Sequence, residues 1–270
     1  MLSPERDRAN AGKKSYKVVF IGAGNVAVHL SLAMKEAGFS IIQVYSHTPK
    51  SARNLSDQLN CPYTVNIEDI DQNAGIYLFS VKDDALPDLI RKIPPNKGLW
   101  IHTAGSIPMD IFEKHAKQYG VIYPMQTLSK TRKINFHKTP LFIEGNTPAS
   151  EKKIRHIAEI LSENVHAMTS EKRKYLHLAA VFACNFSNHM YSIATQLLEE
   201  QGIDRHILQP LIDETADKVR TMSPDMAQTG PAIRYDRDIM NRHLALLEDP
   251  AIREIYEIIS KNIYKKLSNK

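Results

Sequence analysis

The chain has 270 residues, of which 43% are hydrophobic and 24% are charged. This is ordinary globular usage and excludes a disordered or fibrous protein. The net charge of +5 comes from Lys and Arg spread along the chain. Since no basic–aromatic motif accompanies them, we expect a phosphate-rich cofactor and an anionic small-molecule substrate, and no nucleic acid.

The sequence also predicts the environment of the protein. No run approaches the ~18 apolar residues of a membrane span, so we expect no membrane association. The two cysteines, Cys61 and Cys184, form no disulfide framework and indicate a reducing, cytoplasmic location. Residues 1–15 are polar, lack an apolar signal segment and are interpreted as a flexible tail. We predict no metal site.

In the first half of the chain, short β-rich runs alternate with helical patterns, which is typical of a parallel sheet covered by helices. The expected strands are 17–21, 41–45, 62–65, 76–81 and 99–102, with 121–123 and 141–143 extending the sheet. The expected helices are 26–37, 51–59 and one that ends before Pro94. The order predicts an α/β domain of the Rossmann type, with a doubly wound parallel sheet, over residues 16–169.

After about Ser170 the periodicity is helical throughout. We expect helices over 171–201, 205–221, 238–247 and 252–267, and no strand. These form a smaller, all-helical substrate and dimerisation domain over residues 170–270. Because so small a segment with one very long helix buries little surface, we expect it to pair with a second copy in a homodimer.

A glycine-containing turn joins the first strand to the first helix. Gly22 permits a tight turn, Gly24 lets the backbone approach a pyrophosphate, and Ala27 stands where a third glycine often does. The following helix start, with Asn25 and Val26, presents free N–H groups to phosphates. We predict dinucleotide binding here; a purely structural turn is the alternative.

The residues after the second strand favour NADP over NAD. An NAD site normally places an acid about 20 residues after the turn, but no carboxylate occurs between Glu36 and Asp57. Hydroxyls and cations that suit a 2′-phosphate occur there instead. They are Ser46, His47, Thr48, Lys50 and Arg53. A solvated polar loop is the alternative interpretation.

Ligands of such sheets bind at the carboxyl ends of the strands, and we call the row of strand ends along which the cofactor should lie the expected cofactor track. Two further strand ends belong to it. Val81 and Lys82 follow the fourth strand. Thr103, Ala104 and Gly105 follow the fifth, and their small size lets the backbone approach the nicotinamide ribose.

Three residues of the helical half are candidates for catalysis. On a regular helix, His177 and Asn185 share one face about 12 Å apart. Histidine suits the proton transfer that accompanies hydride transfer to a carbonyl or imine, and Asn185 could orient the substrate oxygen. Arg234, after the turn Gly230–Pro231, is a candidate clamp for a carboxylate or phosphate. The alternatives are a histidine and an asparagine in helix packing, and an arginine that ties its loop to a helix end.

The expected cleft lies between the glycine turn and the helix face that carries His177 and Asn185, with Arg234 at its rim. Within this hypothesis the nicotinamide points toward the later helices, from the same subunit or its partner.

Several segments together resemble a bacterial family that joins a Rossmann-like domain to a helical domain of unknown function, described as NADP oxidoreductases of the deazaflavin-dependent type. The resembling segments are 21–26, 45–48, 102–106, 123–127, 177–185 and 228–234. The resemblance implies an NADP-binding fold and a dimer, and names no substrate. One departure is Tyr235, where the family commonly has glycine before Asp236.

The two-part plan is more distantly similar to 6-phosphogluconate dehydrogenase, ketopantoate reductase and pyrroline-carboxylate reductase. In the first two, a Lys and an Asn four residues apart act on the substrate, but here Leu178 lies four after Lys174 and Val181 four before Asn185. The hypothesis is therefore an NADP(H)-dependent oxidoreductase acting on a small, anionic carbonyl or imine. The alternative is a non-catalytic NADP(H)-binding sensor or regulatory protein. The sequence leaves open the substrate, the direction of hydride transfer and a deazaflavin partner.

Overall fold

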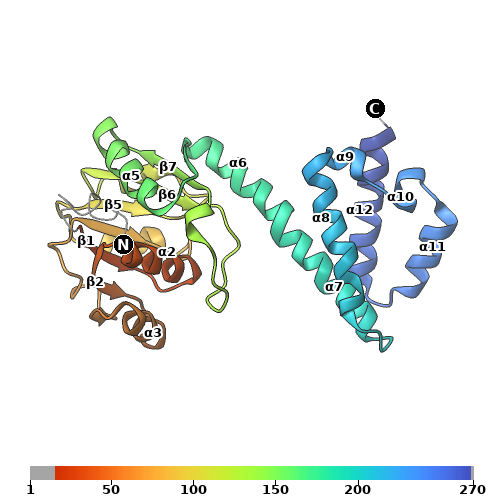
Figure 1. The fold of residues 1–270 in the computed structure, drawn as a ribbon, viewed down its shortest axis with the longest axis horizontal. Helices are drawn as coiled ribbons and strands as arrows, with labels where there is room; N and C mark the ends of the chain where they lie inside the picture. The colour runs from red at the N-terminus through yellow and green to blue at the C-terminus, as the bar shows by residue number, and fades with distance from the viewer. Residues whose placement is uncertain (1–15, 269–270) are drawn as a thin grey trace, which may run out of the picture. The chain divides into compact units, whose positions relative to one another are not determined.

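The computed structural model describes residues 16–268, so the tail predicted over residues 1–15 lies outside the described part. The chain divides into two compact units, the first ending at Cys184 and the second beginning at Asn185 (Figure 1). They are called unit 1 and unit 2 below, and each is described by itself. The domain boundary predicted between residues 169 and 170 stays a prediction.

Unit 1 contains an eight-stranded sheet in the order β3-β2-β1-β4-β5-β6-β7-β8. The strands are β1 (Lys17–Ile21), β2 (Ser40–Tyr45), β3 (Tyr63–Thr64), β4 (Ile76–Phe79), β5 (Leu99–His102), β6 (Gln118–Pro124), β7 (Leu141–Gly145) and β8 (Val165–Ala167). All neighbours are parallel except β6 and β7, which are antiparallel. The doubly wound, Rossmann-type sheet is thereby confirmed, with one antiparallel pair and with β8 as an additional strand.

Four helices and two short 3₁₀ turns connect the strands of this sheet. They are α2 (Asn25–Glu36), α3 (Pro49–Leu59), α4 (Leu86–Lys92), η1 (Met109–Phe112), η2 (Phe136–Lys138) and α5 (Pro148–Leu161). Helix α5 was not predicted, although its start carries a clear signal. The Thr147 hydroxyl accepts a hydrogen bond from the Ser150 amide at 3.1 Å, and Pro148 occupies the first helical position.

Both faces of the sheet are covered. Along β1, Val18 and Phe20 belong to one buried cluster and Val19 and Ile21 to the other, because successive side chains of a strand point to opposite faces. Helices α2 and α5 contribute to the first cluster, and the second surrounds Trp100. The two buried clusters hold the strands in place and so determine where the residues at the strand ends lie.

The region after residue 169 is helical, and among residues 170–268 the structure contains no strand. Its elements are α6 (Ser170–Ala180), a π-helical segment η3 (Val181–Phe186), α7 (Ser187–Glu199), η4 (Arg205–Leu208), α8 (Gln209–Thr221), α9 (Pro224–Ala227), α10 (Pro231–Arg234), α11 (Arg237–Leu246) and α12 (Pro250–Ser268). The long helix expected over 171–201 is thus interrupted by π-helical turns, whose wider i→i+5 bonding changes the helix register. Of the helices within residues 16–268, none is long and apolar enough to span a membrane.

Tyr235 ends the short helix α10 in a left-handed conformation, with φ of 51°. Glycine adopts this conformation without strain, whereas a tyrosine adopts it at a cost in backbone energy. In this chain the Tyr235 ring stacks on Tyr264 at a centroid distance of 4.5 Å, and the Arg237 guanidinium lies 5.0 Å from the same ring. These contacts offset part of the backbone strain.

Candidate cofactor and active site

The carboxyl ends of β1, β2, β4, β5 and β6 meet at one edge of the sheet, because these strands are mutually parallel. In sheets of this type ligands bind at that edge. The loops that leave it and the N-terminal parts of α2 and α3 carry all the predicted cofactor-binding residues of unit 1, which therefore share one edge.

The turn after β1 has two glycines with different physical roles. Gly22 has φ of 115° and donates from its amide to the Tyr45 carbonyl at 2.8 Å; a Cβ there would lie 2.1 Å from the Ser80 carbonyl oxygen. Only glycine fits this position. A Cβ on Gly24 would have the same oxygen as its nearest neighbour, at 4.0 Å. The protein itself therefore leaves space at Gly24, beside the start of α2, as the diphosphate of a dinucleotide requires.

The loop after β2 presents polar groups that suit a phosphate. Ser46 is buried and accepts a hydrogen bond from the Thr48 amide at 3.4 Å, while the Thr48 hydroxyl contacts His47 Nε2 at 3.1 Å. Arg53 lies exposed one turn into α3, and its Nε donates to the Tyr63 hydroxyl at 3.4 Å. This contact holds the guanidinium at the same end of β2 as the hydroxyls.

The loops after β4 and β5 are tied to each other. The Thr103 hydroxyl donates to Ser80 Oγ at 3.1 Å, and the Ser106 hydroxyl donates to the Asp83 carboxylate. Lys82 is exposed beside them, and Val81 is half-buried. These hydrogen bonds fix the two loops to each other, so that together they form one surface at this edge of the sheet.

His102, the last residue of β5, is fully buried and plays a structural part. Burial lowers its pKa to about 3, the Arg173 charge adds to the shift, and the Pro108 carbonyl opposes it. Its Nδ1 accepts a hydrogen bond from the Ala104 amide at 3.2 Å. The ring is therefore neutral at physiological pH and shapes the loop that contains Gly105.

A buried ion pair anchors the start of α6 to the sheet. Arg173, with a side chain only 1% exposed, donates to Glu144 of β7 at 2.7 Å and to the Ile107 carbonyl at 2.6 Å. Glu144 also accepts from the Ser170 amide and hydroxyl at 2.8 and 2.6 Å. The first turn of α6 is thus fixed to β7 and to the loop after β5. Sequence patterns alone do not predict this anchor.

His177 lies one helical turn after Arg173, on the same face of α6. Its Nδ1 is 3.1 Å from the hydroxyl of Tyr123 at the end of β6, and the two rings meet edge to face. A Cβ on Gly105 would lie 2.6 Å from Cγ and Nδ1 of the imidazole, so the ring packs directly on the loop after β5. The structure therefore brings His177 to the edge that carries the glycine turn.

Tyr123 was missed as a functional residue by the sequence analysis. Burial raises the pKa of its hydroxyl, and the nearby Arg173 charge opposes the shift. The phenol therefore keeps its proton at neutral pH, and its oxygen can accept a hydrogen bond from Nδ1–H of His177, which leaves Nε2 as the nitrogen that exchanges protons. This arrangement can orient a histidine that transfers protons through Nε2.

The other two candidate catalytic residues belong to unit 2. Asn185 is exposed and lies in the π-helical segment, so the 12 Å spacing computed for a regular helix does not apply. Arg234 is exposed at the end of α10; within the described residues it makes neither an ion pair nor a hydrogen bond, and it is not seen tying its loop to a helix end. Their roles stay predictions.

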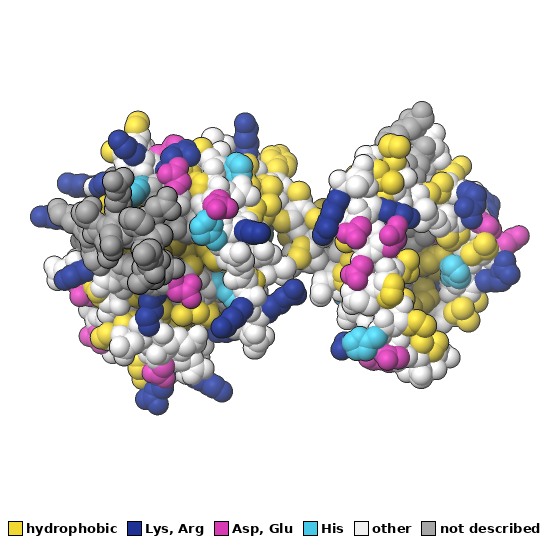
Figure 2. Space-filling view, in the orientation of Figure 1, with side chains coloured by type: hydrophobic (Ala, Val, Ile, Leu, Met, Phe, Trp, Pro, Cys, Tyr) yellow, Lys and Arg dark blue, Asp and Glu magenta, His cyan; other side chains and the backbone are white. Residues whose placement is uncertain are grey.

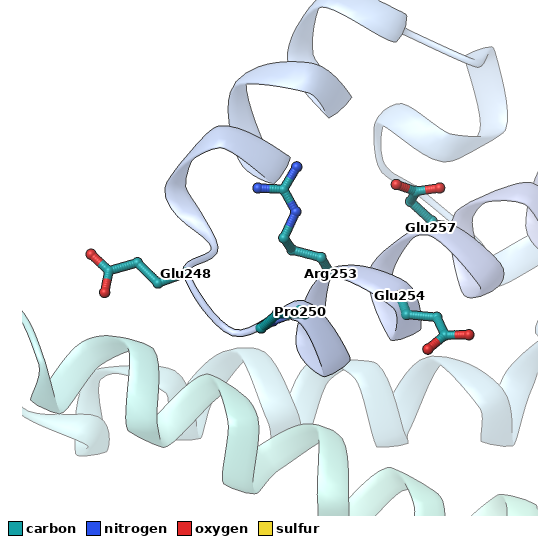
Figure 3. Close-up of a pocket in the computed structure, with 5 residues that line it drawn as sticks. All are labelled: Glu248, Pro250, Arg253, Glu254 and Glu257. Atoms are coloured by element: carbon teal, nitrogen blue, oxygen red, sulfur yellow. The ribbon is translucent and has the colours of Figure 1, made fainter.

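A hollow of about 520 Å³ lies elsewhere, at the start of α12 (Figure 3). It is lined by Glu248, Pro250, Arg253, Glu254 and Glu257. Three carboxylates and one cation disfavour a dinucleotide phosphate, and the side chains splay apart instead of converging. Over residues 16–268, no cluster of three His, Cys, Asp or Glu side chains has a metal-binding arrangement.

Comparison with known proteins gives two family matches. Residues 17–101 match the model described as NADP oxidoreductase, coenzyme F420-dependent, and residues 139–263 match a domain of unknown function, DUF2520. No curated protein sequence matches the chain.

Similar solved structures cover nearly the whole chain. A Bacteroides fragilis protein that is provisionally named an NADP oxidoreductase is 45% identical over 93% of this chain and 98% of its own, with a TM-score of 0.90. Pyrroline-5-carboxylate reductase from Streptococcus pyogenes is 12% identical over 93% and 98% of the chains, with a TM-score of 0.60. An imine reductase from Myxococcus stipitatus, solved with NADP⁺, is 15% identical over 94% and 93%, with a TM-score of 0.62. The last two show a shared fold.

Proposed function

The chain belongs to the oxidoreductase family that joins an NAD(P)-binding, Rossmann-like domain to a DUF2520 domain, and on this basis we propose that it is an NADP(H)-dependent oxidoreductase acting on a small, anionic carbonyl or imine. The observation that carries the proposal is the packing of His177 on Gly105 and its contact with Tyr123, at the same sheet edge as the glycine turn. A proton-transferring side chain beside a cofactor edge is what such a reductase requires.

The preference for NADP(H) rests on the loop after β2. Ser46, Thr48 and Arg53 supply hydroxyls and a guanidinium where an NAD site normally has a carboxylate. Guanidinium groups bind phosphate through charge-assisted hydrogen bonds, whereas a carboxylate repels it. The names of two similar structures support the same cofactor, since one is called an NADP oxidoreductase and the other was solved with NADP⁺.

When bound at this edge, a nicotinamide cofactor would supply a hydride, with its two electrons, to the carbon of the C=O or C=N bond. The oxygen or nitrogen of that bond must gain a proton, and protonated His177 donates it from Nε2. Tyr123 holds the other ring nitrogen, so the imidazole keeps its orientation while it loses and regains its proton. Arg234 and Asn185 are proposed to bind and orient the anionic substrate.

Unit 2 is proposed to form a homodimer. Its described residues include three buried apolar side chains, Ala232, Met240 and Leu247, while Leu211 and Met226 are 63% and 78% exposed. Figure 2 shows many hydrophobic side chains on the visible surface of unit 2. So much exposed apolar surface on so small a unit is typical of an interface, and a second copy of the chain is the occupant we propose.

A combined binding and turnover experiment tests the proposal. Calorimetry should give tighter binding of NADPH than of NADH, and a panel of carbonyl and imine acids should then oxidise NADPH in the presence of the protein. Tight NADPH binding without turnover of any compound would favour the non-catalytic sensor. Equal or reversed affinity for the two cofactors would refute the NADP preference.

A further inference from the structure

The segment between β6 and η2 carries a feature that the proposed function does not use. The Asn25 side-chain amide, in the first residue of α2, donates to the Leu128 carbonyl at 2.7 Å. One turn later, His29 Nε2 lies 2.9 Å from the Ser129 carbonyl. Two side chains of α2, the helix that follows the glycine turn, therefore bind the segment that leaves the sheet after β6.

The strand order determines the path of this loop. It leaves the sheet at Pro124 of β6 and reaches α2, which follows β1, and the strands between them are β5 and β4. Three strand spacings amount to about 14 Å. The Leu128 carbonyl, four residues after Pro124, already meets the Asn25 side chain at the carboxyl end of β1. The segment therefore runs along the edge of the sheet at which β5 and β4 also end.

This path coincides with the expected cofactor track. One end lies beside Tyr123, which contacts His177, and the other lies at the glycine turn. Gln126 and Thr127, in the middle, are both exposed. Within the described residues the Thr127 hydroxyl makes no hydrogen bond, and the Gln126 side-chain oxygen accepts from the Thr127 amide at 2.9 Å, which leaves the Gln126 amide group to donate.

Resting on the proposed function, we infer that residues 124–129 form a cofactor strap. In this inference Gln126 and Thr127 donate hydrogen bonds to the bound dinucleotide between its diphosphate and its nicotinamide ribose. Asn25 is a positioning residue, since its amide is engaged by the strap. Side-chain amides and hydroxyls are neutral donors that suit ribose and phosphate oxygens. Both cofactors share these groups, so the strap strengthens the binding of NADPH and NADH equally.

Hydrogen exchange of the full-length protein tests the strap directly. On addition of NADPH, amides of residues 125–129 should exchange more slowly, while those of α11 should not change. Unchanged exchange in the strap, at a concentration where calorimetry shows saturation, would overturn the inference and leave the proposed function intact. A wild-type protein that binds no NADPH would overturn both.

Variants provide the second measurement. Gln126→Ala, Thr127→Ala and Asn25→Ala should each weaken NADPH and NADH by the same factor, about three- to tenfold for a lost hydrogen bond. Ser129→Ala is the matched control, because the strap is held through the Ser129 carbonyl, which this substitution keeps. Wild-type affinity in all three variants would contradict the strap.

Discussion

The hydroxyl of Tyr123 and Nδ1 of His177 lie 3.1 Å apart, although 54 residues separate them in the chain. Tyr123 is the penultimate residue of β6, and His177 lies on α6 one turn after Arg173. The buried pair of Arg173 with Glu144 fixes the helix, the helix presents the imidazole, and the phenol fixes its orientation. The contact therefore depends on the buried ion pair between Arg173 and Glu144.

The two glycines of the turn should respond differently to alanine. Gly22→Ala forces a Cβ to 2.1 Å from the Ser80 oxygen and should lower the free energy of unfolding by about 1–3 kcal/mol or more. Gly24→Ala, with its nearest neighbour at 4.0 Å, should leave that free energy within about 0.5 kcal/mol and weaken NADPH at least about tenfold. Urea unfolding and calorimetry measure the two effects. A Gly24→Ala protein with unchanged NADPH affinity would refute the assignment of this turn.

Arg53→Ala should weaken NADPH about tenfold or more and leave NADH unchanged, because the guanidinium is expected to meet only the 2′-phosphate. Arg91→Ala is the control, since Arg91 is also exposed but pairs with Asp88 on α4. Both affinities are measured by calorimetry. Equal losses for the two cofactors would argue against a 2′-phosphate contact.

Glu144→Ala should destabilise unit 1 by about 3–5 kcal/mol, because it leaves the Arg173 charge buried and unpaired. Chemical unfolding followed by tryptophan fluorescence reports on unit 1, where the single Trp, Trp100, is fully buried. Glu151→Ala is the control, since Glu151 pairs with Arg155 on the surface of α5. A loss no larger than in the control would show that the pair does not anchor α6.

Light scattering at micromolar concentration should give twice the chain mass of 30.6 kDa. Leu211→Glu should shift the protein toward the monomer, since a charge on an interface helix has to be desolvated. Val65→Glu, at a partly exposed apolar position of unit 1, should leave the mass unchanged. A wild-type monomer across this range would contradict the proposed dimer.

The Rossmann-type fold of the first half of the chain could be predicted from sequence patterns for a physical reason. The glycine turn and the strands before and after it are local, and their backbone requirements are written in adjacent residues such as Gly22. Helix α5 was missed although Thr147 and Pro148 signal its start, and β8, with three residues, is too short for any periodicity. The π-helical segment was missed because its mainly apolar residues resemble those of a regular helix.

The pairing of Tyr123 with His177 could not be predicted in the same way. It depends on where α6 docks, and the docking depends on the ion pair between Glu144 and Arg173, 29 residues apart in the chain. The sequence predicted His177 as a candidate proton donor. Its partner Tyr123 on β6 could be identified only from the three-dimensional fold.

The pH dependence of NADPH oxidation tests the role of Tyr123. A reaction that consumes a proton from a general acid predicts that substrate reduction slows as the pH rises. The raised pKa of Tyr123 keeps the phenol protonated at neutral pH. Tyr123→Phe should lower the rate and move the midpoint of the profile, with NADPH affinity unchanged. A lower rate with an unmoved midpoint would assign Tyr123 a packing role.

The most direct test of the central claim compares the wild type with His177→Gln, both saturated with NADPH, in single-turnover oxidation with a panel of carbonyl and imine acids. We predict that the wild type oxidises NADPH with at least one compound and that His177→Gln binds NADPH equally well but reacts about a hundredfold more slowly or worse. Equal rates for the two proteins would contradict the assignment of His177 as the proton donor.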